Sequence, residues 1–210
     1  GGGEQQKTIE RQIAETRPRY QSELSNLSLY GLLLFATPTA LALCRILSLP
    51  IWQVADSAAP ALGLGISTMR LGCYLNGCCF GKPCGAPWAV VFPFGSPAWS
   101  HQILSGETGI LGLGGAVSPV HPTQLYELVA ALILGAISIL VIKSEIADGL
   151  AFLVFATGFS VFRIANAHFR ANIITSDVNS WIHPFIYYVI PALLAALLIS
   201  RARESIRRRV

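Results

Sequence analysis

Two long stretches of the sequence carry no charged side chain, and they constrain the fold more than any other feature. Residues 24–44 and residues 178–200 form uncharged runs of 21 and 23 residues. A helix of about 20 apolar residues spans the roughly 30 Å hydrocarbon core of a bilayer. Only 12% of the 210 residues are charged, whereas soluble domains carry about 25%. We therefore predict an integral membrane protein with lipid around much of its surface.

Three shorter apolar segments reach spanning length only if each includes a charged residue. Residues 57–69 end at Arg70, residues 128–142 follow Glu127, and residues 149–162 end at Arg163. The prediction is an all-α integral membrane protein with about five transmembrane helices, at about residues 27–48, 54–76, 122–143, 149–170 and 182–200. A small irregular extracytoplasmic head, residues 78–120, is expected between the second and third helices because this stretch is rich in proline and glycine.

The two ends of the chain are polar. Residues 1–26 are expected to be a surface helix or disordered, and residues 27–200 the transmembrane domain. Residues 201–210 hold five arginines and one glutamate. After an apolar helix this tail favours a cytoplasmic C-terminus over nucleic-acid binding, so the head would lie outside. Since the chain begins at Gly1 and its only methionine is Met69, we expect a fragment or a processed product.

Charged residues inside predicted spans are the strongest indication of function. An arginine at the centre of a membrane helix costs roughly 2.5–3.5 kcal/mol. Two compatible interpretations are open: Glu127 forms a structural ion pair with Arg70 or Arg163, or the arginines line a site for an anionic lipid headgroup. Helical spacing places Arg163, Asn166 and Arg170 on one face. The planar donor fork of arginine suits phosphate or carboxylate.

Polar side chains also enter the third predicted span, in the segment His121 to Glu127. His121, Gln124 and Tyr126 stand at the start of an otherwise apolar helix. A histidine at this position can cap the helix or lie at the membrane interface. With a glutamine, a tyrosine and a glutamate beside it, the cluster is equally well explained as the lining of a site.

Four of the five cysteines fall within twelve residues, in the pattern C-x4-C-C-x4-C, at Cys73, Cys78, Cys79 and Cys84. The segment has no C-x2-C pair and no histidine at zinc-finger spacing. A metal site is therefore disfavoured against a disulfide on the outer side or simple packing thiols. We predict no metal and no organic cofactor.

The segment around Arg70 resembles a signature of the prolipoprotein diacylglyceryl transferase family, Gly-Arg-x-Gly-Asn-Phe-x-Asn-x-Glu-x-x-Gly. Matching positions are Arg70, Gly72, Asn76 and Gly81, while Cys73 and Cys78 stand where the family has Asn and Glu. Further blocks follow in the family's order: Gln53 to Asp56, Pro87 to Pro93, His121 to Glu127, and Phe162-Arg163 with Phe169-Arg170. The resemblance covers about residues 28–200, and it implies seven spans, two of them upstream of Leu24.

The resemblance implies a bacterial plasma-membrane enzyme that moves the diacylglyceryl group of phosphatidylglycerol to the lipobox cysteine thiol of a prolipoprotein signal peptide. Its expected partners are those two substrates and the lipid bilayer, with no nucleic acid. The expected catalytic residues are Arg70, Arg163, His121 and Tyr30. Arg70 and Arg163 would hold the phosphate. Tyr30 stands where the family has a histidine but is a poor base, so His121 would take the proton. Substrate-binding residues are expected at Gly72, Asn76, Gly81, Gln124, Tyr126, Glu127, Asn166 and Arg170. The replacements at Tyr30 and Cys73 motivate an alternative, a non-catalytic lipid-binding or lipoprotein-handling membrane protein on the same scaffold.

Overall fold

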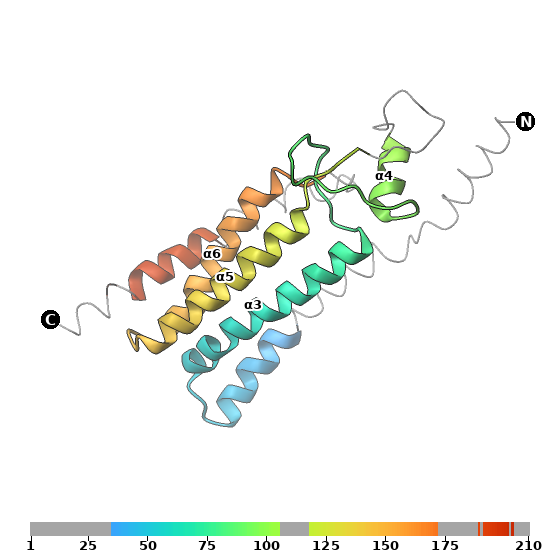
Figure 1. Ribbon diagram of the computed structural model, residues 1–210. Coiled ribbons are helices and arrows are strands. Elements are labelled where there is room, and N and C mark those ends of the chain that lie inside the picture. The colour runs from blue at the N-terminus through green and yellow to red at the C-terminus, as the bar shows by residue number, and fades with distance from the viewer. Residues whose placement is uncertain (1–34, 106–117, 172–188, 190, 202, 204–210) are drawn as a thin grey trace, which may run out of the picture. The chain divides into compact units, whose positions relative to one another are not determined.

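The computed structural model describes residues 35–105, 118–171, 189, 191–201 and 203 (Figure 1). The described part contains six helices: α3 (Ile51–Asn76), α4 (Pro97–Ser105), α5 (Thr123–Lys143), α6 (Leu150–Ala167), and unlabelled helices at Phe35–Ile46 and Pro191–Arg201. Beyond these helices, its regular structure is limited to three isolated β-bridges. The prediction of an all-helical protein is therefore confirmed for these residues.

Two of these helices, α5 and α6, are long and apolar enough to cross a membrane. The helix at Phe35–Ile46 and the helix at Pro191–Arg201 are apolar but shorter. α3 overlaps the second predicted span. The number of spans and the domain boundaries stay predictions. The chain divides into two compact units, Gly1–Ile51 and Trp52–Val210, and the site lies wholly in the second.

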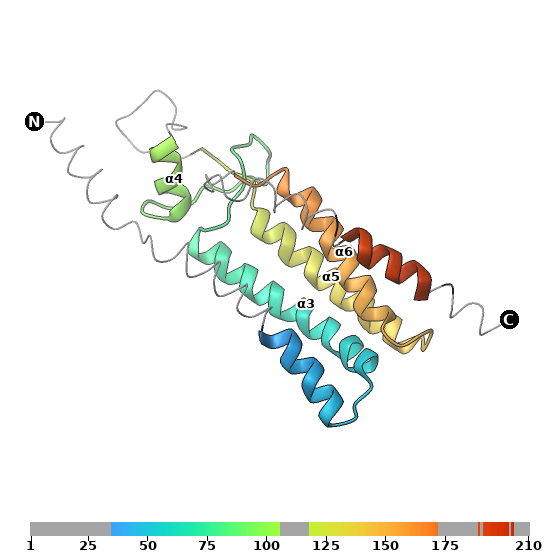
Figure 2. The same ribbon diagram turned by 180° about the vertical axis from the view of Figure 1, so that it is seen from behind.

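Helices α3, α5 and α6 lie side by side in the second unit, as opposite views agree (Figures 1 and 2). α5 runs antiparallel to the other two. Arg70 near the end of α3 and Arg163 near the end of α6 both approach Glu127 in the first turns of α5. One end of this three-helix group therefore collects the charged residues that the sequence places in separate spans.

Small residues allow α3 and α5 to approach closely. A Cβ atom on Gly63 would lie 2.8 Å from the carbonyl oxygen of Ala131 and 3.0 Å from the Cα of Gly135. The Ser67 hydroxyl bridges the same helices because it lies within hydrogen-bonding distance of two carbonyls, those of Gly63 (2.7 Å) and Leu128 (3.2 Å). Such small-residue contacts are typical of helix pairs packed in lipid.

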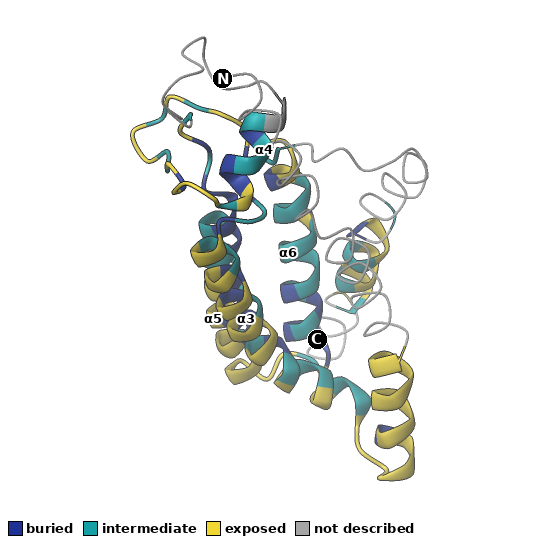
Figure 3. Ribbon diagram, turned by 90° about the vertical axis from the view of Figure 1, so that its right-hand side faces the viewer, coloured by how far each residue is buried: buried dark blue, intermediate teal, exposed yellow. Residues whose placement is uncertain are grey.

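The distribution of side chains on α5 is inverted relative to a soluble helix. Its buried residues are small or polar: Thr123, Gln124, Glu127, Ala131, Gly135 and Ser138. Its exposed residues include Val129, Leu132, Ile133, Ile137, Ile139, Leu140 and Ile142. Figure 3 shows many exposed positions along α3 and α5, whereas α6 is mainly of intermediate or buried exposure. An apolar exterior around a polar interior is the pattern expected of a helix that faces lipid.

The opposite end of the three-helix group is fixed by Asp56 on α3. Its carboxylate accepts hydrogen bonds from the backbone N–H of Gly149 (2.6 Å) and of Phe152 (2.9 Å). These are free N–H groups at the start of α6, which have no partner within their own helix. Gly149 has a φ of +87°, and a Cβ there would meet the ring of Trp52. Asp56 thus acts as an N-terminal cap supplied from another helix.

The region between α3 and α5 is more ordered than the irregular head predicted from its composition. It contains α4 and a set of extended segments that bridge one another, Gly81 with Arg170 and both Pro83 and Val90 with Val120. Phe80, Phe92, Ala98 and Val120 form a small buried core there. Residues 106–117 lie outside the described part. The head therefore ties the end of α6 to the loop that follows α3.

Candidate functional site

Glu127 is the centre of a buried charged group. Its side chain is 2% exposed, and guanidinium groups from three positions surround it. Arg70 Nε lies 2.5 Å from Oε2, Arg163 Nη1 lies 3.6 Å from Oε2, and Arg170 Nη1 lies 4.0 Å from Oε1. Arg70 Nε and Glu127 Oε2 lack hydrogen-bond geometry, so this contact is an ion pair. The ion pair predicted from the sequence is confirmed, and we call these four residues the arginine cluster.

Asn166 fixes the carboxylate from the side of α6. Its Nδ2 group donates to Glu127 Oε1 at 3.0 Å and to the carbonyl of Thr123 at 3.3 Å. All three residues are at least 98% buried. A buried carboxylate costs several kcal/mol of desolvation unless charges and hydrogen bonds compensate for it. Here Asn166 and the arginines supply that compensation, and together they lock the ends of α3, α5 and α6.

The arginines differ in exposure. The Arg70 side chain is 8% exposed, whereas those of Arg163 and Arg170 are 30% and 29% exposed. Arg70 is also the closest of the three to the carboxylate. Arg70 therefore neutralises Glu127 inside the protein, while Arg163 and Arg170 can also present donors to a molecule outside it.

Two buried amide oxygens have no hydrogen-bond partner within the described part of the chain. They are Gln124 Oε1 and Asn166 Oδ1. Both amide nitrogens are occupied, because Gln124 Nε2 donates to the carbonyl of Cys78 at 2.6 Å and Asn166 Nδ2 donates as described above. Buried acceptors are rarely left unmatched. A ligand with hydroxyl donors would satisfy them.

His121 belongs to a chain of polar rings at the start of α5. Its Nδ1 atom lies 3.1 Å from the hydroxyl of Tyr126, and that hydroxyl accepts a hydrogen bond from Trp88 Nε1 at 2.8 Å. The ring of Phe169 packs against His121 at 5.2 Å between centroids. Sequence reasoning did not select Trp88, although it lies in the block Pro87 to Pro93 that carried part of the resemblance.

The remaining predicted positions are dispersed. Gly81 lies between two backbone segments, where a Cβ would approach the Phe169 and His121 carbonyl oxygens to 2.6 and 2.7 Å. Gly72 and Asn76 are exposed on α3, and helical spacing places them away from the face of Arg70. The structure does not bring these two residues into the arginine cluster. Tyr30 lies outside the described residues.

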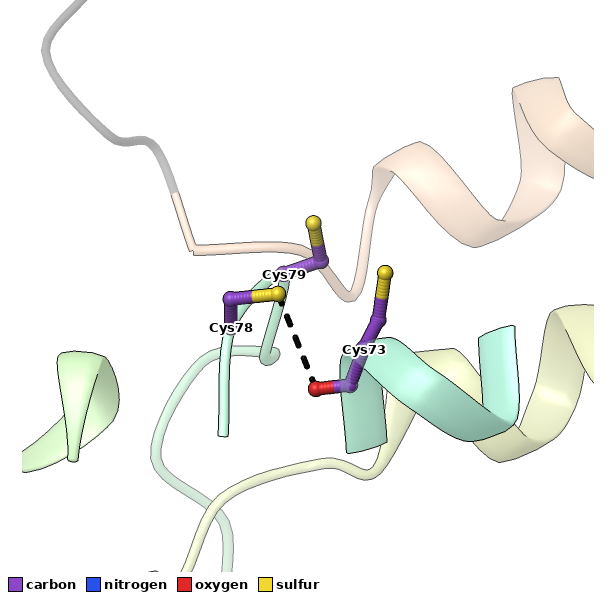
Figure 4. A group of neighbouring side chains, drawn as sticks. All are labelled: Cys73, Cys78 and Cys79. Atoms are coloured by element: carbon purple, nitrogen blue, oxygen red, sulfur yellow. Dashed lines mark hydrogen bonds between the residues drawn. The ribbon is translucent and has the colours of Figure 1, made fainter. Parts of the chain in front are cut away.

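All five cysteines are described and unpaired, and three of them gather at the end of α3 (Figure 4). The sulfur atoms of Cys73, Cys78 and Cys79 all lie within 4.8 Å of one another. The hydrogen bond from the Cys79 thiol lowers the pKa of Cys78 to about 7. The same bond raises the pKa of Cys79. Cys84, the fourth cysteine of the sequence pattern, is not part of this group.

An apolar groove of about 590 Å³ runs along α5 and α6. It is lined by Leu125, Tyr126, Val129, Ala130, Ile133, Leu134, Gly158 and Phe162. Tyr126 and Phe162 directly precede Glu127 and Arg163 in sequence. The groove therefore reaches the level of the arginine cluster, and its lining suits a hydrocarbon chain.

Comparison with known proteins gives consistent similarities. A phosphatidylglycerol–prolipoprotein diacylglyceryl transferase of Rhodopirellula baltica is 48% identical over 67 residues, or 31% of this chain and 13% of the relative. The protein of the same description from Dehalococcoides mccartyi strain 195 is 28% identical over 146 residues, 70% of this chain and 50% of the relative. That of Proteus mirabilis is 33% identical over 124 residues, 57% of this chain and 42% of the relative. The chain spans half or less of the length of these curated relatives.

A family model supports the same assignment over most of the chain. The model described as prolipoprotein diacylglyceryl transferase matches residues 23–200. This range includes α3, α5 and α6, the arginine cluster, and the three grouped cysteines. The chain therefore belongs to the prolipoprotein diacylglyceryl transferase family.

Proposed function

We propose that this protein transfers the diacylglyceryl group of phosphatidylglycerol to the lipobox cysteine thiol of a prolipoprotein. The observation that carries the proposal is the arginine cluster next to an apolar groove. A phospholipid needs both features, because its phosphate is an anion and its acyl chains are hydrocarbon. Three guanidinium groups lie within 4.0 Å of one buried carboxylate, and the groove beside them is lined almost wholly by apolar side chains.

In the proposed reaction the acceptor thiol attacks a glycerol carbon of the lipid. A carbon–sulfur bond forms, the bond from that carbon to the phosphate oxygen breaks, and glycerol phosphate leaves. Negative charge develops on the leaving phosphate, so cations fixed in advance in a low-dielectric site stabilise the transition state. Arg163 and Arg170 hold this phosphate through their donor forks. Arg70 acts from inside, because its ion pair with Glu127 keeps the carboxylate from repelling the anion.

The headgroup of phosphatidylglycerol also carries two hydroxyls, which are hydrogen-bond donors. Gln124 Oε1 and Asn166 Oδ1 are buried acceptors without partners in the described part of the chain, and they suit these hydroxyls. One acyl chain occupies the groove along α5 and α6. Gly81 serves by letting the backbone at His121 and Phe169 approach closely, while Gly72 and Asn76 contribute to substrate binding only from the opposite face of α3.

The thiol proton goes to His121 Nε2. The Tyr126 oxygen has two lone pairs and accepts from both Trp88 Nε1–H and His121 Nδ1–H. In this tautomer Nε2 carries the free lone pair of the imidazole. Tyr126 and Trp88 are thus positioning residues for the base. Tyr30 keeps its predicted catalytic role as a proposal.

The proposed setting is the bacterial plasma membrane. The polar interior and apolar exterior of α5 suit a bilayer, and the arginine-rich C-terminus suits the cytoplasmic side. The head after α3 then faces outward, on the side where a translocated signal peptide presents its lipobox cysteine. The protein partners are prolipoproteins, and the reaction uses the lipid of the outer leaflet.

The test is transfer of labelled diacylglyceryl from phosphatidylglycerol vesicles to a lipobox peptide by the full-length protein. Arg163→Ala should slow transfer roughly 100-fold or more, the usual cost of losing one transition-state donor. Arg163→Lys should recover part of the rate, because charge returns without the fork. Arg45→Ala, an exposed arginine outside the site, is the matched control and should leave the rate unchanged.

Absence of transfer by wild-type protein that still binds phosphatidylglycerol would refute the proposal. The same result would favour a non-catalytic protein that binds lipid or handles lipoproteins on this scaffold. The Cys73 position, where the family signature has Asn, is the observation that keeps this second function in view. Rescue of a strain depleted of its own transferase separates the two functions in cells.

A further inference from the structure

The three grouped thiols form a site that the proposed lipid chemistry does not use. The sulfurs of Cys73, Cys78 and Cys79 lie within 4.8 Å of one another, and each residue is half-buried. Figure 4 shows Cys73 projecting from the end of α3 and the other two from the following loop. Their convergence was not expected from the spacing C-x4-C-C.

A helix-ending motif brings the loop back to the helix. Gly77 has a φ of +69°; its N–H donates to the carbonyl of Tyr74, and the N–H of Cys78 donates to the carbonyl of Cys73 at 3.1 Å. These two bonds and the left-handed glycine define a Schellman motif. It returns the chain over the last turn, so that residues five positions apart become neighbours.

Side chains of α5 hold the loop in place. The carbonyl of Cys78 accepts from Gln124 Nε2 at 2.6 Å, and the carbonyl of Cys79 accepts from the Thr123 hydroxyl at 2.8 Å. Both donors are 1% exposed. The backbone beneath two of the three sulfurs is therefore anchored to the same helix that carries Glu127.

We infer that Cys73, Cys78 and Cys79 bind one zinc ion with an open fourth position, and that this position takes the acceptor thiol. Zinc–sulfur bonds of about 2.3 Å in a tetrahedron place the sulfurs about 3.8 Å apart, so a contraction of at most about 1 Å completes the site. Among the described residues no fourth Cys, His, Asp or Glu belongs to the group. Three protein ligands with one open position are the arrangement of catalytic zinc.

This inference rests on the proposed function, because the acceptor in that reaction is itself a thiol. A thiol that coordinates zinc is deprotonated. Its proton leaves to the base or to water, and the zinc-bound thiolate attacks the glycerol carbon. The new thioether sulfur is neutral and a weaker ligand, so it leaves the ion and reopens the position. The ion is neither oxidised nor reduced, and the bond changes are those of the proposed transfer.

The site is well placed for this role. Arg70 precedes Cys73 by three residues on α3, so the two side chains share a face with an axial separation of about 4.5 Å. A thiolate bound at the zinc would therefore stand about one helical turn from the arginine cluster. Cys73 and Cys78 occupy signature positions at which the family resemblance has Asn and Glu.

The first measurement is metal content and spectroscopy of the full chain in lipid nanodiscs, purified under reducing conditions. We expect one zinc per chain, and cobalt substitution should give the charge-transfer bands of three thiolate ligands. Cys73→Ser, Cys78→Ser and Cys79→Ser should each lose the ion. Cys84→Ser, a half-buried cysteine outside the group, should retain it. Zinc binding no stronger than in the triple variant, or copper(I) bound in place of zinc, would overturn the inference.

The second measurement adds a lipobox peptide to the cobalt-substituted protein. A cysteine peptide should increase the thiolate-to-cobalt absorbance by about one third, because ligands rise from three to four, and a serine peptide should not. No response to the cysteine peptide overturns the inference, since it means that the fourth position is closed. A disulfide among the three cysteines in freshly isolated protein, reversed by reductant, overturns it as well.

Transfer assays separate this inference from the proposed function. Chelation should slow transfer at pH 7 about tenfold or more, because only a few per cent of a free thiol is ionised there, and added zinc should restore it. If chelation does not change the transfer rate, the proposed function stands and the inference of a zinc ion is refuted. If the protein binds zinc and the peptide thiol coordinates it, but no transfer occurs, the zinc site stands and the proposed function is refuted. Arg163→Ala should slow transfer roughly 100-fold or more without changing the metal content.

Discussion

The two ends of the α3, α5 and α6 group each contain a carboxylate that binds neighbouring helices, half-buried at Asp56 and buried at Glu127, and the two are used differently. The Asp56 carboxylate is satisfied by two backbone hydrogen bonds from the first turn of α6. Glu127 instead faces three arginines, and two amide acceptors beside it have no partner in the described part of the chain. The first end is complete in itself, whereas the second has binding capacity that the described residues do not use.

This difference separates structural polar groups from functional ones in the same helices. The buried Glu127 bears a larger desolvation cost than the half-buried Asp56, but burial alone does not make a binding site. What distinguishes the two ends is whether the hydrogen-bonding groups around the carboxylate all have partners. A cap satisfied by fixed backbone donors has nothing to offer a ligand, while buried acceptors without partners among the described residues do. The comparison can be tested by removing each part in turn.

The largest effect is expected from Glu127→Ala. It removes the only carboxylate within reach of Arg70, Arg163 and Arg170 among the described residues, and breaking a buried ion pair from one side typically costs about 3–5 kcal/mol. Chemical unfolding in detergent, followed by tryptophan fluorescence, measures the loss. Glu127→Gln should cost less because it can still accept from Asn166. Glu127→Gln lacks the charge but keeps the acceptor for Asn166, so wild-type stability in this variant would mean that charge is not what holds the cluster.

The next largest effect is expected from Gly81→Ala, which acts where the head meets the cluster. The new methyl would lie 2.6 Å from the Phe169 carbonyl oxygen and 2.7 Å from that of His121, and backbone atoms cannot rotate away. Overpacking of this kind costs about 1–3 kcal/mol, and it should also lower transfer by displacing His121. Gly85→Ala in the same loop has no atom within 4 Å of the new methyl and is the control. Equal stability of the two variants would contradict the close packing.

The sequence predicted the charged end better than it predicted the capped end. The cost of placing Arg70, Arg163 and Glu127 in apolar helices requires that such residues meet, and this reasoning works without knowing the fold. Asp56 gave no comparable indication. Its partners, Gly149 and Phe152, follow more than 90 residues later, and an aspartate near the start of a helix is unremarkable. Only the packing of α3 against α6 reveals its role.

The cysteines show a different limit of sequence reasoning. Spacing rules look for C-x2-C pairs, because two residues separated by a tight turn can hold one ion. Here the closing element is the glycine turn at Gly77, which folds Cys78 back onto Cys73. Sequence spacing alone does not fix the direction in which a chain leaves a helix. The polar relay through Trp88 was missed for the same reason, since its partner Tyr126 lies 38 residues away.

A smaller effect is expected from Asp56→Ala. Loss of a helix N-cap costs about 0.5–2 kcal/mol, and here the first turn of α6 would lose both of its cross-helix acceptors. Unfolding should occur at lower denaturant, while the transfer rate measured under native conditions should stay within about twofold. Ser57→Ala, which removes an exposed local bond, is the matched control and should change stability by less than about 0.5 kcal/mol. A large loss of transfer without loss of stability would place Asp56 in the functional end.

The smallest effect concerns reactivity rather than stability, and it sharpens the account of the functional end. The thiol of Cys79 donates to Cys78 and lowers its pKa to about 7, so the Cys78 thiolate forms as pH rises through about 7 instead of about 9. In metal-free protein, alkylation of Cys78, followed by peptide mass spectrometry, should therefore reach half its maximal rate near pH 7. Cys79→Ala removes the donor and should move that midpoint upward. An unchanged midpoint would show that the Cys79 thiol does not donate a hydrogen bond to Cys78.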